Sequence, residues 1–329
     1  MLSGMIFTIP AAAENKMSGK CGYNLTWTVE GDTLTISGTG EMYPYNWGCE
    51  EAPWENMTNI KKLVIGDGVL NIADAFRNNN EIEEIVAADS VIDIPGRIFE
   101  ETEWYKNQPD GAIYIGKILY LYKDSTHSAV SLDIKDGTRA VSSYALNESD
   151  KLSDISIPDS IEYIGESAFD YTDWYINLYK NHEDGVVYVG NTAYGYKGTI
   201  PDNTTIELKE GTKCVANRTF EGQSGLTGIR LPDSIKTMHT IALMNTNVEK
   251  LDFPEGLIYL CDSFEYMKNL QSITVDGGNK YYSSDENGVL YNKDKTRLIT
   301  YPAGKTESEF EIPVSVKTIG HHSFFLQQT

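Results

Sequence analysis

The chain has 329 residues, of which 40% are hydrophobic, enough to bury a continuous core and too many for an intrinsically disordered protein. Its 48 acidic and 27 basic residues give a formal charge of −21, without any block of basic residues. A charge of this sign repels phosphate groups, so the sequence disfavours nucleic acids and anionic membrane surfaces as partners.

The start of the chain, MLSGMIFTIPAAAE, is a short apolar run that ends in small residues. This pattern is typical of the end of a secretory signal peptide. We expect residues 1–20 to be a signal-peptide remnant or a disordered leader, with an ordinary frayed terminus as the alternative. No later segment is apolar for long enough to cross a bilayer, so we expect no membrane insertion.

Residues 21–57 predict an N-terminal β cap. Apolar and polar residues alternate over 25–29, a turn follows at Gly31–Asp32, and the alternation resumes over 34–36. Such a hairpin has one apolar face and can cover the exposed end of a following array. An independent binding module is the alternative.

Residues 58–329 contain an internal repeat, most complete in LSDISIPDSIEYIGESAFD from Leu152 to Asp170. Successive copies begin 22 or 23 residues apart where they are not interrupted. A unit this short cannot bury a core of its own, so the copies must stack as the rungs of a solenoid. The copies begin at Ile60, Ile82, Ala129, Leu152, Asn203, Leu226, Val248, Leu270 and Glu307.

Each rung predicts a short strand followed by a turn. In the most complete copy, Ile155 and Ile157 alternate toward the core and Pro158 begins the turn. A slip of one residue would exchange the two faces of every strand. The residues predicted to point away from the core are Lys62, Val64, Glu84, Val86, Ser131, Asp133, Asp154, Ser156, Thr205, Glu207, Gly228, Arg230, Lys250, Asp252, Ser272, Thr274, Glu309 and Glu311.

Three hairpins interrupt the array, at about 103–126, 172–200 and 279–304. The first two resemble each other: each has a Trp-Tyr pair, then Asp-Gly, then two strands joined at Gly116–Lys117 or Gly190–Asn191. Two-residue turns led by glycine favour tight antiparallel pairing. The third hairpin, GVLYNKDKTRLITY from Gly288, follows a rung strand directly and replaces a repeat arm.

The first two hairpins carry the candidate ligand-binding residues. Most of these aromatic rings are expected to pack the hairpins onto the solenoid, because two-stranded ribbons need apolar packing. The alternative is that the two Trp-Tyr pairs lie roughly 10 Å apart on a common ridge, since they follow rungs two steps apart. Rings on such a ridge would bind a ligand, and their removal would leave the melting temperature nearly unchanged. The candidates are Trp104, Tyr105, Trp174, Tyr175, Tyr120, Tyr122, Tyr194 and Tyr196.

The cysteines and histidines do not suggest a metal site or a cofactor. Cys214 and Cys261 lie two rungs apart, about 10 Å, too far for a disulfide, and we expect free thiols. Cys21 and Cys49 flank the cap hairpin and could pair. His321–His322, the only histidine pair, has side chains that would point apart. The segment SSDENG lacks the ligand register of a calcium loop, so a hairpin turn is favoured there.

The repeat pattern L-x-x-I-x-I-P-x-x-I-x-x-I-G-x-x-A-F resembles the BspA-like leucine-rich repeat family. Residues 21–54 are similar to the segment that often precedes such arrays, and residues 279–305 to a hairpin often embedded in them. The copies from Ala129 and Asn203 depart from the pattern, with lysine in place of the proline. The resemblance implies an α+β, mostly β solenoid: a leucine-rich-repeat array of short parallel strands with hairpin insertions.

The resemblance also implies a secreted or cell-surface bacterial protein without catalytic residues or a cofactor. Our first hypothesis is a non-catalytic binding or adhesion protein that recognises an extracellular protein or glycan. The second is a structural accessory region of a longer surface enzyme acting on polysaccharide, because the chain stops at Thr329 inside a repeat. The sequence beyond that residue would separate the two.

Overall fold

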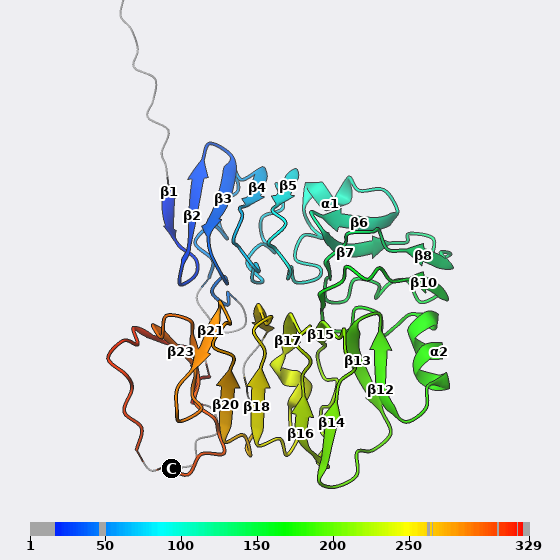
Figure 1. The fold of residues 1–329 in the computed structure, drawn as a ribbon. Coiled ribbons are helices and arrows are strands. Elements are labelled where there is room, and N and C mark those ends of the chain that lie inside the picture. Colours follow the sequence, from blue (N-terminus) through cyan, green and yellow to red (C-terminus); the bar gives the residue numbers. More distant parts are fainter. Residues whose placement is uncertain are drawn as a thin grey trace, which may run out of the picture. The chain divides into compact units, whose positions relative to one another are not determined.

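The computed structural model describes residues 17–45, 51–261, 264, 266–307, 309–320 and 322–324. The chain forms two compact units (Figure 1). The first contains the residues up to Val91 together with Ile98–Gln108, and the second contains Ile92–Arg97 and everything from Pro109 onward. Most of the leader, Cys49 and His321 lie outside the described residues, and the boundaries predicted at residues 20 and 57 stay predictions.

One sheet organises the first unit, with the strand order β1-β2-β3-β4-β5. The first three strands are antiparallel neighbours, whereas β3, β4 and β5 are parallel. Leu34 of the hairpin lies opposite Leu63 of the first rung, so the predicted cap hairpin is confirmed. The strands are β1 (Met17–Lys20), β2 (Leu25–Glu30), β3 (Thr33–Gly38), β4 (Lys62–Ile65) and β5 (Glu84–Ala87).

A column of aromatic rings runs through the core of the first unit. Trp54 stacks on Phe76 with 5.4 Å between ring centroids, and Phe76 lies 5.6 Å from Phe99. Trp27 of the cap and Trp104 contact the two ends, at 5.9 Å from Trp54 and 6.2 Å from Phe99. Phe76 and Phe99 occupy the last position of the repeat pattern, so the period of the sequence places one ring above another.

The second unit begins with the first inserted hairpin and two rungs. Strand β7 pairs antiparallel with β6 and parallel with β9, so the hairpin supplies the first strand of a new ladder. The pairs β8–β10 and β9–β11 are parallel. These strands are β6 (Gly111–Ile115), β7 (Ile118–Lys123), β8 (Ser131–Asp133), β9 (Ala140–Val141), β10 (Asp154–Ser156) and β11 (Tyr163–Ile164).

The second inserted hairpin starts another ladder in the same way. Strand β13 pairs antiparallel with β12 and parallel with β15, and the sheet continues through β17 to β19. The rung strands on the other side form the pairs β14–β16 and β18–β20. These elements are β12 (Gly185–Val189), β13 (Thr192–Lys197), β14 (Thr204–Glu207), β15 (Cys214–Val215), β16 (Leu226–Arg230), β17 (Thr237–His239), the 3-10 helix η1 (Thr240–Leu243), β18 (Lys250–Phe253), β19 (Tyr259–Cys261) and β20 (Ser272–Val275).

The third hairpin ends the second unit with an antiparallel sheet and one parallel strand. Its order is β21-β22-β23-β24, and β24 belongs to the last partial rung. The turn predicted at SSDENG is formed by Asp285, whose carboxylate accepts the backbone N–H groups of Asn287 and Val289. The strands are β21 (Tyr282–Ser284), β22 (Leu290–Asn292), β23 (Arg297–Thr300) and β24 (Thr318–Ile319).

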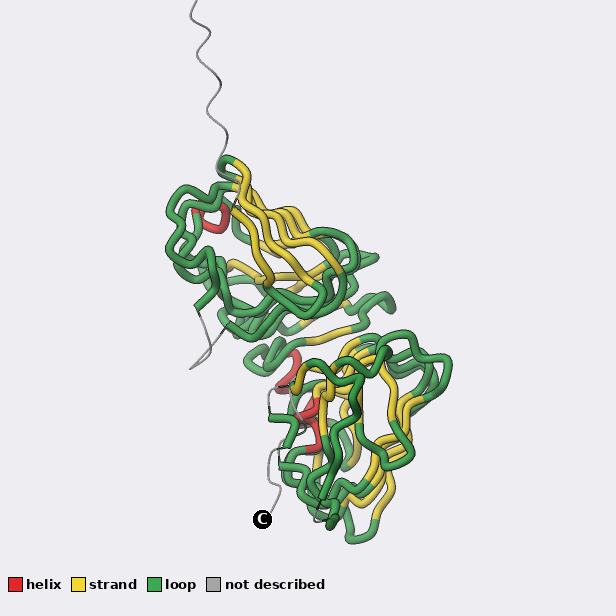
Figure 2. Tube along the Cα trace, turned by 90° about the vertical axis from the view of Figure 1, so that its left-hand side faces the viewer, coloured by secondary structure: helices red, strands yellow, loops and turns green. Residues whose placement is uncertain are grey.

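The strand register confirms the repeat period. Asp154 lies opposite Ser131, 23 residues earlier, and Lys250 lies opposite Ser272, 22 residues later. None of the residues predicted to point away from the core is buried, whereas their inward neighbours, such as Ile155 and Leu251, are. The predicted solenoid and its strand face are therefore correct, and the stacked strands with their connecting loops are visible in Figure 2.

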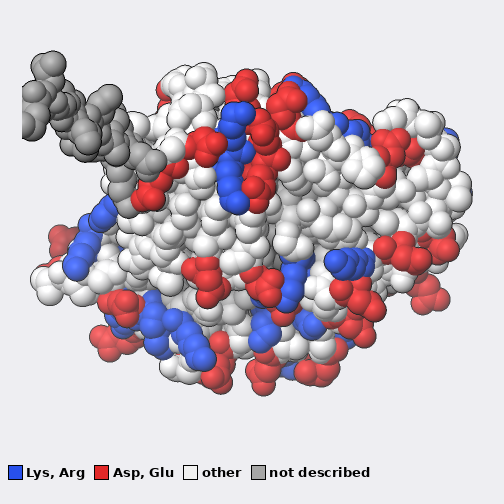
Figure 3. Space-filling model, turned by 90° about the horizontal axis from the view of Figure 1, so that it is seen from above, with Lys and Arg blue, Asp and Glu red and all other residues white. Residues whose placement is uncertain are grey.

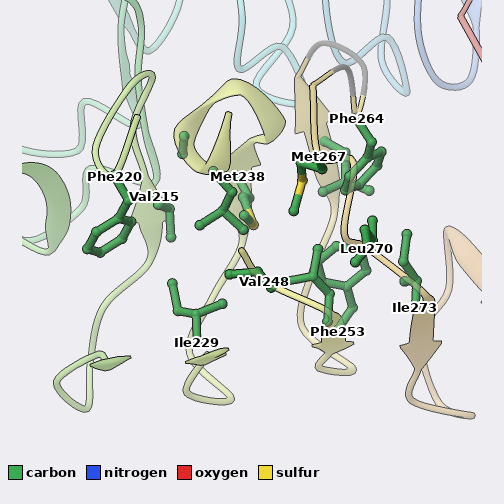
Figure 4. Close-up of a cluster of buried hydrophobic side chains, with 14 of the residues drawn as sticks. Val215, Phe220, Ile229, Met238, Val248, Phe253, Phe264, Met267, Leu270 and Ile273 are labelled. Atoms are coloured by element: carbon green, nitrogen blue, oxygen red, sulfur yellow. The ribbon is translucent and has the colours of Figure 1, made fainter. Parts of the chain in front are cut away.

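Apolar side chains from successive rungs form the core of the second unit (Figure 4). Ile229, Leu251 and Ile273 occupy the same position of three consecutive rungs, and all belong to one buried cluster. Cys214 is buried nearby as a free thiol, and burial raises its pKa to about 11. Cys261 is likewise a thiol that forms no disulfide with Cys214, as the rung spacing predicts.

A short helix precedes each of the first two inserted hairpins, an element that the sequence pattern did not predict. Helix α1 (Glu103–Lys106) and helix α2 (Asp173–Asn181) are capped by Thr102 and Thr172, each of which accepts the backbone N–H of the tyrosine three residues later. In each helix the backbone N–H of the tryptophan donates to the rung: Trp104 to Ile82, and Trp174 to Leu152, both at 2.7 Å. Within the described residues, no helix combines the length and the apolar character needed to span a bilayer.

The inserted hairpins contain a β-bulge that the alternating pattern did not predict. In the second hairpin, Val187 pairs with Gly195 and Tyr188 with Ala193, which leaves Tyr194 as the extra residue. In the first hairpin, Tyr120 takes the same position and is fully buried, whereas Tyr122 is half-buried. A bulge interrupts the strict alternation of side chains, so alternation alone does not say which face each of these tyrosines takes.

A buried asparagine fastens the third hairpin to the solenoid. The Asn279 amide donates to the carbonyl groups of Pro254 and Leu257, at 3.1 and 2.9 Å, and its oxygen accepts the N–H groups of Tyr281 and Tyr282. The residue is 0% exposed, so water cannot replace these bonds.

Replacing Asn279 by Asp should lower the free energy of unfolding by about 3 kcal/mol, because the donors are lost and a carboxylate then faces carbonyl oxygens in the core. Equilibrium urea unfolding measures the change. The exposed Asn177→Asp, on α2, is the control and should cost less than about 0.5 kcal/mol. Equal effects of the two substitutions would contradict the role of Asn279.

At one corner of several rungs, a residue other than glycine has a left-handed backbone conformation. The φ angle is 59° at Tyr144, 49° at Ser167 and 59° at Arg218, all one position before the Ala-Phe step of the repeat or its equivalent. A side chain in this region is strained by about 1–2 kcal/mol.

Replacing Ser167 by Gly should therefore raise the free energy of unfolding by about 0.5–1 kcal/mol, once the greater freedom of the unfolded chain is subtracted. The matched change Ser156→Gly, on the exposed face of β10, should instead lower it by about 0.5–1 kcal/mol. Thermal and urea unfolding of both variants tests the opposite signs, and destabilisation by Ser167→Gly would show that the corner is not strained.

Candidate functional site

A cleft of about 240 Å³ opens in the second unit beside helix α2 and the β12–β13 hairpin. Four tyrosines line it, Tyr175 and Tyr179 from α2 and Tyr194 and Tyr196 from β13. We refer to it as the tyrosine cleft. Figure 1 shows the helix beside the hairpin, and the Tyr179 hydroxyl donates to the carbonyl of Tyr196 at 3.2 Å.

Local sequence rules place these rings together. Tyr175 and Tyr179 are four residues apart on α2 and therefore share one face of the helix. Their ring centroids are 6.2 Å apart. Tyr175 also packs edge-to-face with Tyr194, with 4.9 Å between the ring centroids. Tyr194 is only 6% exposed, while Tyr179 is 37% exposed. The cleft thus has a rigid inner ring and an accessible outer one.

Hydrogen bonds fix the inner wall of the tyrosine cleft. The Tyr194 hydroxyl donates to the Asp170 carboxylate at 2.8 Å and accepts the backbone N–H of Phe169 at 3.0 Å. Burial raises the pKa of Tyr194 and Tyr175 well above the usual value for tyrosine, and the negative charge of Asp170 adds to the effect. Both phenols therefore keep their protons at any physiological pH and remain hydrogen-bond donors.

Four charged side chains line the same cleft. Arg218 lies between Glu166 and Glu221, with nitrogen-to-oxygen distances of 3.6 and 3.5 Å. Asp170 completes the set, and no Lys or Arg of the described residues forms an ion pair with it. Three carboxylates and one guanidinium give the lining a charge of −2.

The tyrosine cleft lies where one run of rungs ends and the next begins. Glu166 and Asp170 belong to the rung from Leu152, while Arg218 and Glu221 belong to the rung from Asn203. Gln223 holds the connecting loop, because its side chain accepts the N–H of Ile200 and donates to the carbonyl of Gly198. Hydrogen bonds therefore hold the connecting loop at this wall.

No group of three or more His, Cys, Asp or Glu side chains in the described ranges is arranged to hold a metal ion. Basic and acidic side chains are interspersed on the face seen in Figure 3. The side chains around the cleft offer hydrogen bonds and aromatic contact, which is the chemistry of a binding site.

A family profile described as "BspA type Leucine rich repeat region (6 copies)" matches residues 50–172, 108–197 and 187–307. The chain belongs to this family. The match confirms the resemblance inferred from the repeat pattern. No curated protein matches the chain.

Several solved structures are similar over nearly the whole of this BspA-type chain. A leucine-rich repeat protein from Eubacterium ventriosum is 20% identical, with a TM-score of 0.28, over 95% of this chain and 57% of that one. The pneumococcal vaccine antigen PcpA is 18% identical, with a TM-score of 0.36, over 95% of this chain and 62% of that one. A leucine rich cell surface protein from Faecalibacterium prausnitzii is 18% identical, with a TM-score of 0.33, over 94% and 73%. The chain spans less than two thirds of the length of the first two.

The structure brings together three of the eight candidate residues of this BspA-type chain. Tyr175, Tyr194 and Tyr196 line the tyrosine cleft. Trp104 and Tyr105 are half-buried on α1 in the first unit, whereas Trp174 is on α2 in the second, so a common ridge of Trp-Tyr pairs stays a prediction. Of the hairpin tyrosines, Tyr120 is fully buried and Tyr122 is half-buried on β7.

The sequence analysis missed Tyr179, Asp170 and Arg218. A signal for the first was present: Thr172-Asp173 is a typical helix start, and a helix from there places Tyr179 one turn after Tyr175. Arg218 carries no local signal, because it reaches the cleft only through the fold.

The two tryptophans contact the core rather than the cleft. Trp174 lies 5.7 Å from Phe169, and Trp104 lies 6.2 Å from Phe99. Each ring covers the last phenylalanine of its run of rungs. Because both rings contact core side chains, we expect their removal to lower the free energy of unfolding, whereas the removal of rings exposed on a common ridge would leave stability nearly unchanged.

Replacing Trp174 by Ala should lower the free energy of unfolding by about 2 kcal/mol, part of the cost of a fully buried tryptophan because the ring is half-buried. Tyr171→Ala is the matched control, since Tyr171 is 53% exposed, and it should cost less than about 0.5 kcal/mol. Urea unfolding followed by circular dichroism measures both. A Trp174→Ala protein as stable as the control would return the tryptophan to the list of ligand-contacting residues.

Proposed function

We propose that the chain is a non-catalytic binding or adhesion protein of the bacterial surface or exterior, which recognises a protein or glycan through the tyrosine cleft. The tyrosine cleft is the observation that carries this proposal. It combines partly exposed aromatic rings with fixed polar groups, and such combinations occur where proteins bind ligands. The proposed location rests on membership of the BspA-type family and on the signal-like start of the chain.

A structural role accounts for the polar residues of the repeats themselves. Asp159, Asp233 and Glu255 occupy the same turn position of different rungs, and all are exposed. The carboxylates of the cleft have roles of their own, since Glu166 and Glu221 flank Arg218 and Asp170 accepts from Tyr194. These assignments support binding rather than catalysis.

The test is an array of extracellular-matrix proteins, bacterial surface polysaccharides and host glycans probed with the labelled full chain. We expect reproducible binding to at least one class, and at least tenfold weaker binding by Tyr179→Ala. The matched control is Tyr281→Ala, because Tyr281 is 42% exposed, close to the 37% of Tyr179, and does not line the cleft.

Two results would contradict the proposal, each in a different part. If the folded wild-type chain binds no spot on the array, the proposed binding function is rejected for these classes of ligand. Equal signals from Tyr179→Ala and the wild type would reject the cleft as the site and return attention to the polar strand face. Circular dichroism and melting temperature establish that each variant is folded.

A further inference from the structure

The charges in the tyrosine cleft restrict the ligand it can accept. Three carboxylates face a space of about 240 Å³, so an anionic ligand such as a phosphate or a carboxylate is repelled at short range. Arg218 carries the only positive charge of the lining, and it is already flanked by Glu166 and Glu221. An acidic ligand would have to displace one of these carboxylates.

A cationic ligand is attracted by the net charge of −2 on the lining but meets the Arg218 guanidinium in the same small space. The attraction of Asp170 for a cation is opposed by this fixed positive charge, and Glu166 and Glu221 are already engaged with it. The ligand that meets neither repulsion is neutral.

The polar groups of the cleft include both hydrogen-bond donors and acceptors. Asp170 and the two glutamates accept, Arg218 donates, and the tyrosine hydroxyls can do both. Asp170 is held in place by Tyr194 before any ligand arrives, so binding orders few side chains. Ligand hydroxyl groups suit such a lining, since each donates one bond and accepts others.

The aromatic rings add an apolar surface of limited size. Tyr179 is accessible beside Tyr175, with an angle of 47° between the ring planes, and can contact the C–H groups of a ring-shaped ligand. The volume is smaller than the roughly 300–1,000 Å³ of pockets for drug-sized molecules, which indicates one small ring rather than a long chain inside the cleft.

We infer that the tyrosine cleft binds one neutral, hydroxyl-bearing sugar unit of a glycan, with Tyr175 and Tyr179 against its C–H groups and Asp170 and Arg218 bonded to its hydroxyls. The inference rests on the proposed binding function and narrows its ligand from protein or glycan to a neutral sugar.

The test uses the full chain and a panel of methyl glycosides of glucose, galactose, mannose and N-acetylglucosamine. Each neutral hexoside is paired with its uronic acid and its amino sugar, which differ from it mainly in charge. Saturation-transfer NMR detects binding, and titration gives the dissociation constant. We expect at least one neutral glycoside to bind with a Kd near 1 mM or tighter, and its acidic and amino counterparts to bind at least tenfold more weakly.

Variants assign the binding to the cleft. Tyr179→Ala and Asp170→Asn should each raise the Kd of the neutral glycoside at least fivefold, whereas Tyr281→Ala should leave that Kd unchanged. Asp170→Asn preserves the shape of the side chain but removes its charge and replaces one acceptor oxygen by an NH2 donor, so it tests the carboxylate even if Tyr179→Ala folds poorly.

Four results would overturn the inference. Tighter binding of the amino sugar would make the cleft a cation site, and tighter binding of the uronic acid an anion site. Absence of sugar binding, together with a protein on the array that depends on Tyr179, would reject the sugar while leaving the proposed function intact. Absence of both would reject the proposed function itself.

Discussion

Every other feature of the structure depends on the hydrogen bonds between one rung and the next. A unit of 22 or 23 residues is too small to form a hydrophobic core of its own. Its strand must therefore pair with the strand of a neighbouring unit, as β8 does with β10. The same pairing aligns equivalent side chains, which is why Phe76 lies against Phe99 and Ile229 shares a buried cluster with Leu251. The repeat therefore fixes the register and the core together.

An array held together in this way exposes unpaired strand groups wherever it stops. Helices α1 and α2 satisfy some of these groups, because the backbone N–H groups of Trp104 and Trp174 donate to carbonyl groups of the preceding rungs. The two tryptophan rings also pack against the last phenylalanine of those rungs, Phe99 and Phe169. After α2, hairpin β12–β13 begins the next ladder. The tyrosine cleft is a by-product of this break, since it is lined by the end of one run, the helix, the hairpin and the corner of the next run.

The parts of this design that follow local periodicity could be predicted from the sequence. The rung spacing, the polar strand face and all three hairpins are readable because each depends on neighbours in the chain. The bulge at Tyr194 could not be predicted, because alternation alone gives no reason for an extra residue. The cleft could not be predicted either, since it joins Glu166 to Arg218 across a helix and a hairpin whose placement depends on tertiary packing.

The twin insertions show how a small difference in sequence decides where a site can form. Both start alike, with Thr102 and Thr172 as caps and a Trp-Tyr pair two and three residues on. Helix α1 ends at Lys106, shortly before Pro109, which cannot supply the backbone N–H that another turn needs. Helix α2 continues to Asn181 and so carries Tyr179, the most accessible ring of the cleft, for which the first insertion has no counterpart. A second helical turn, rather than the Trp-Tyr pair itself, distinguishes the insertion that has a candidate binding site.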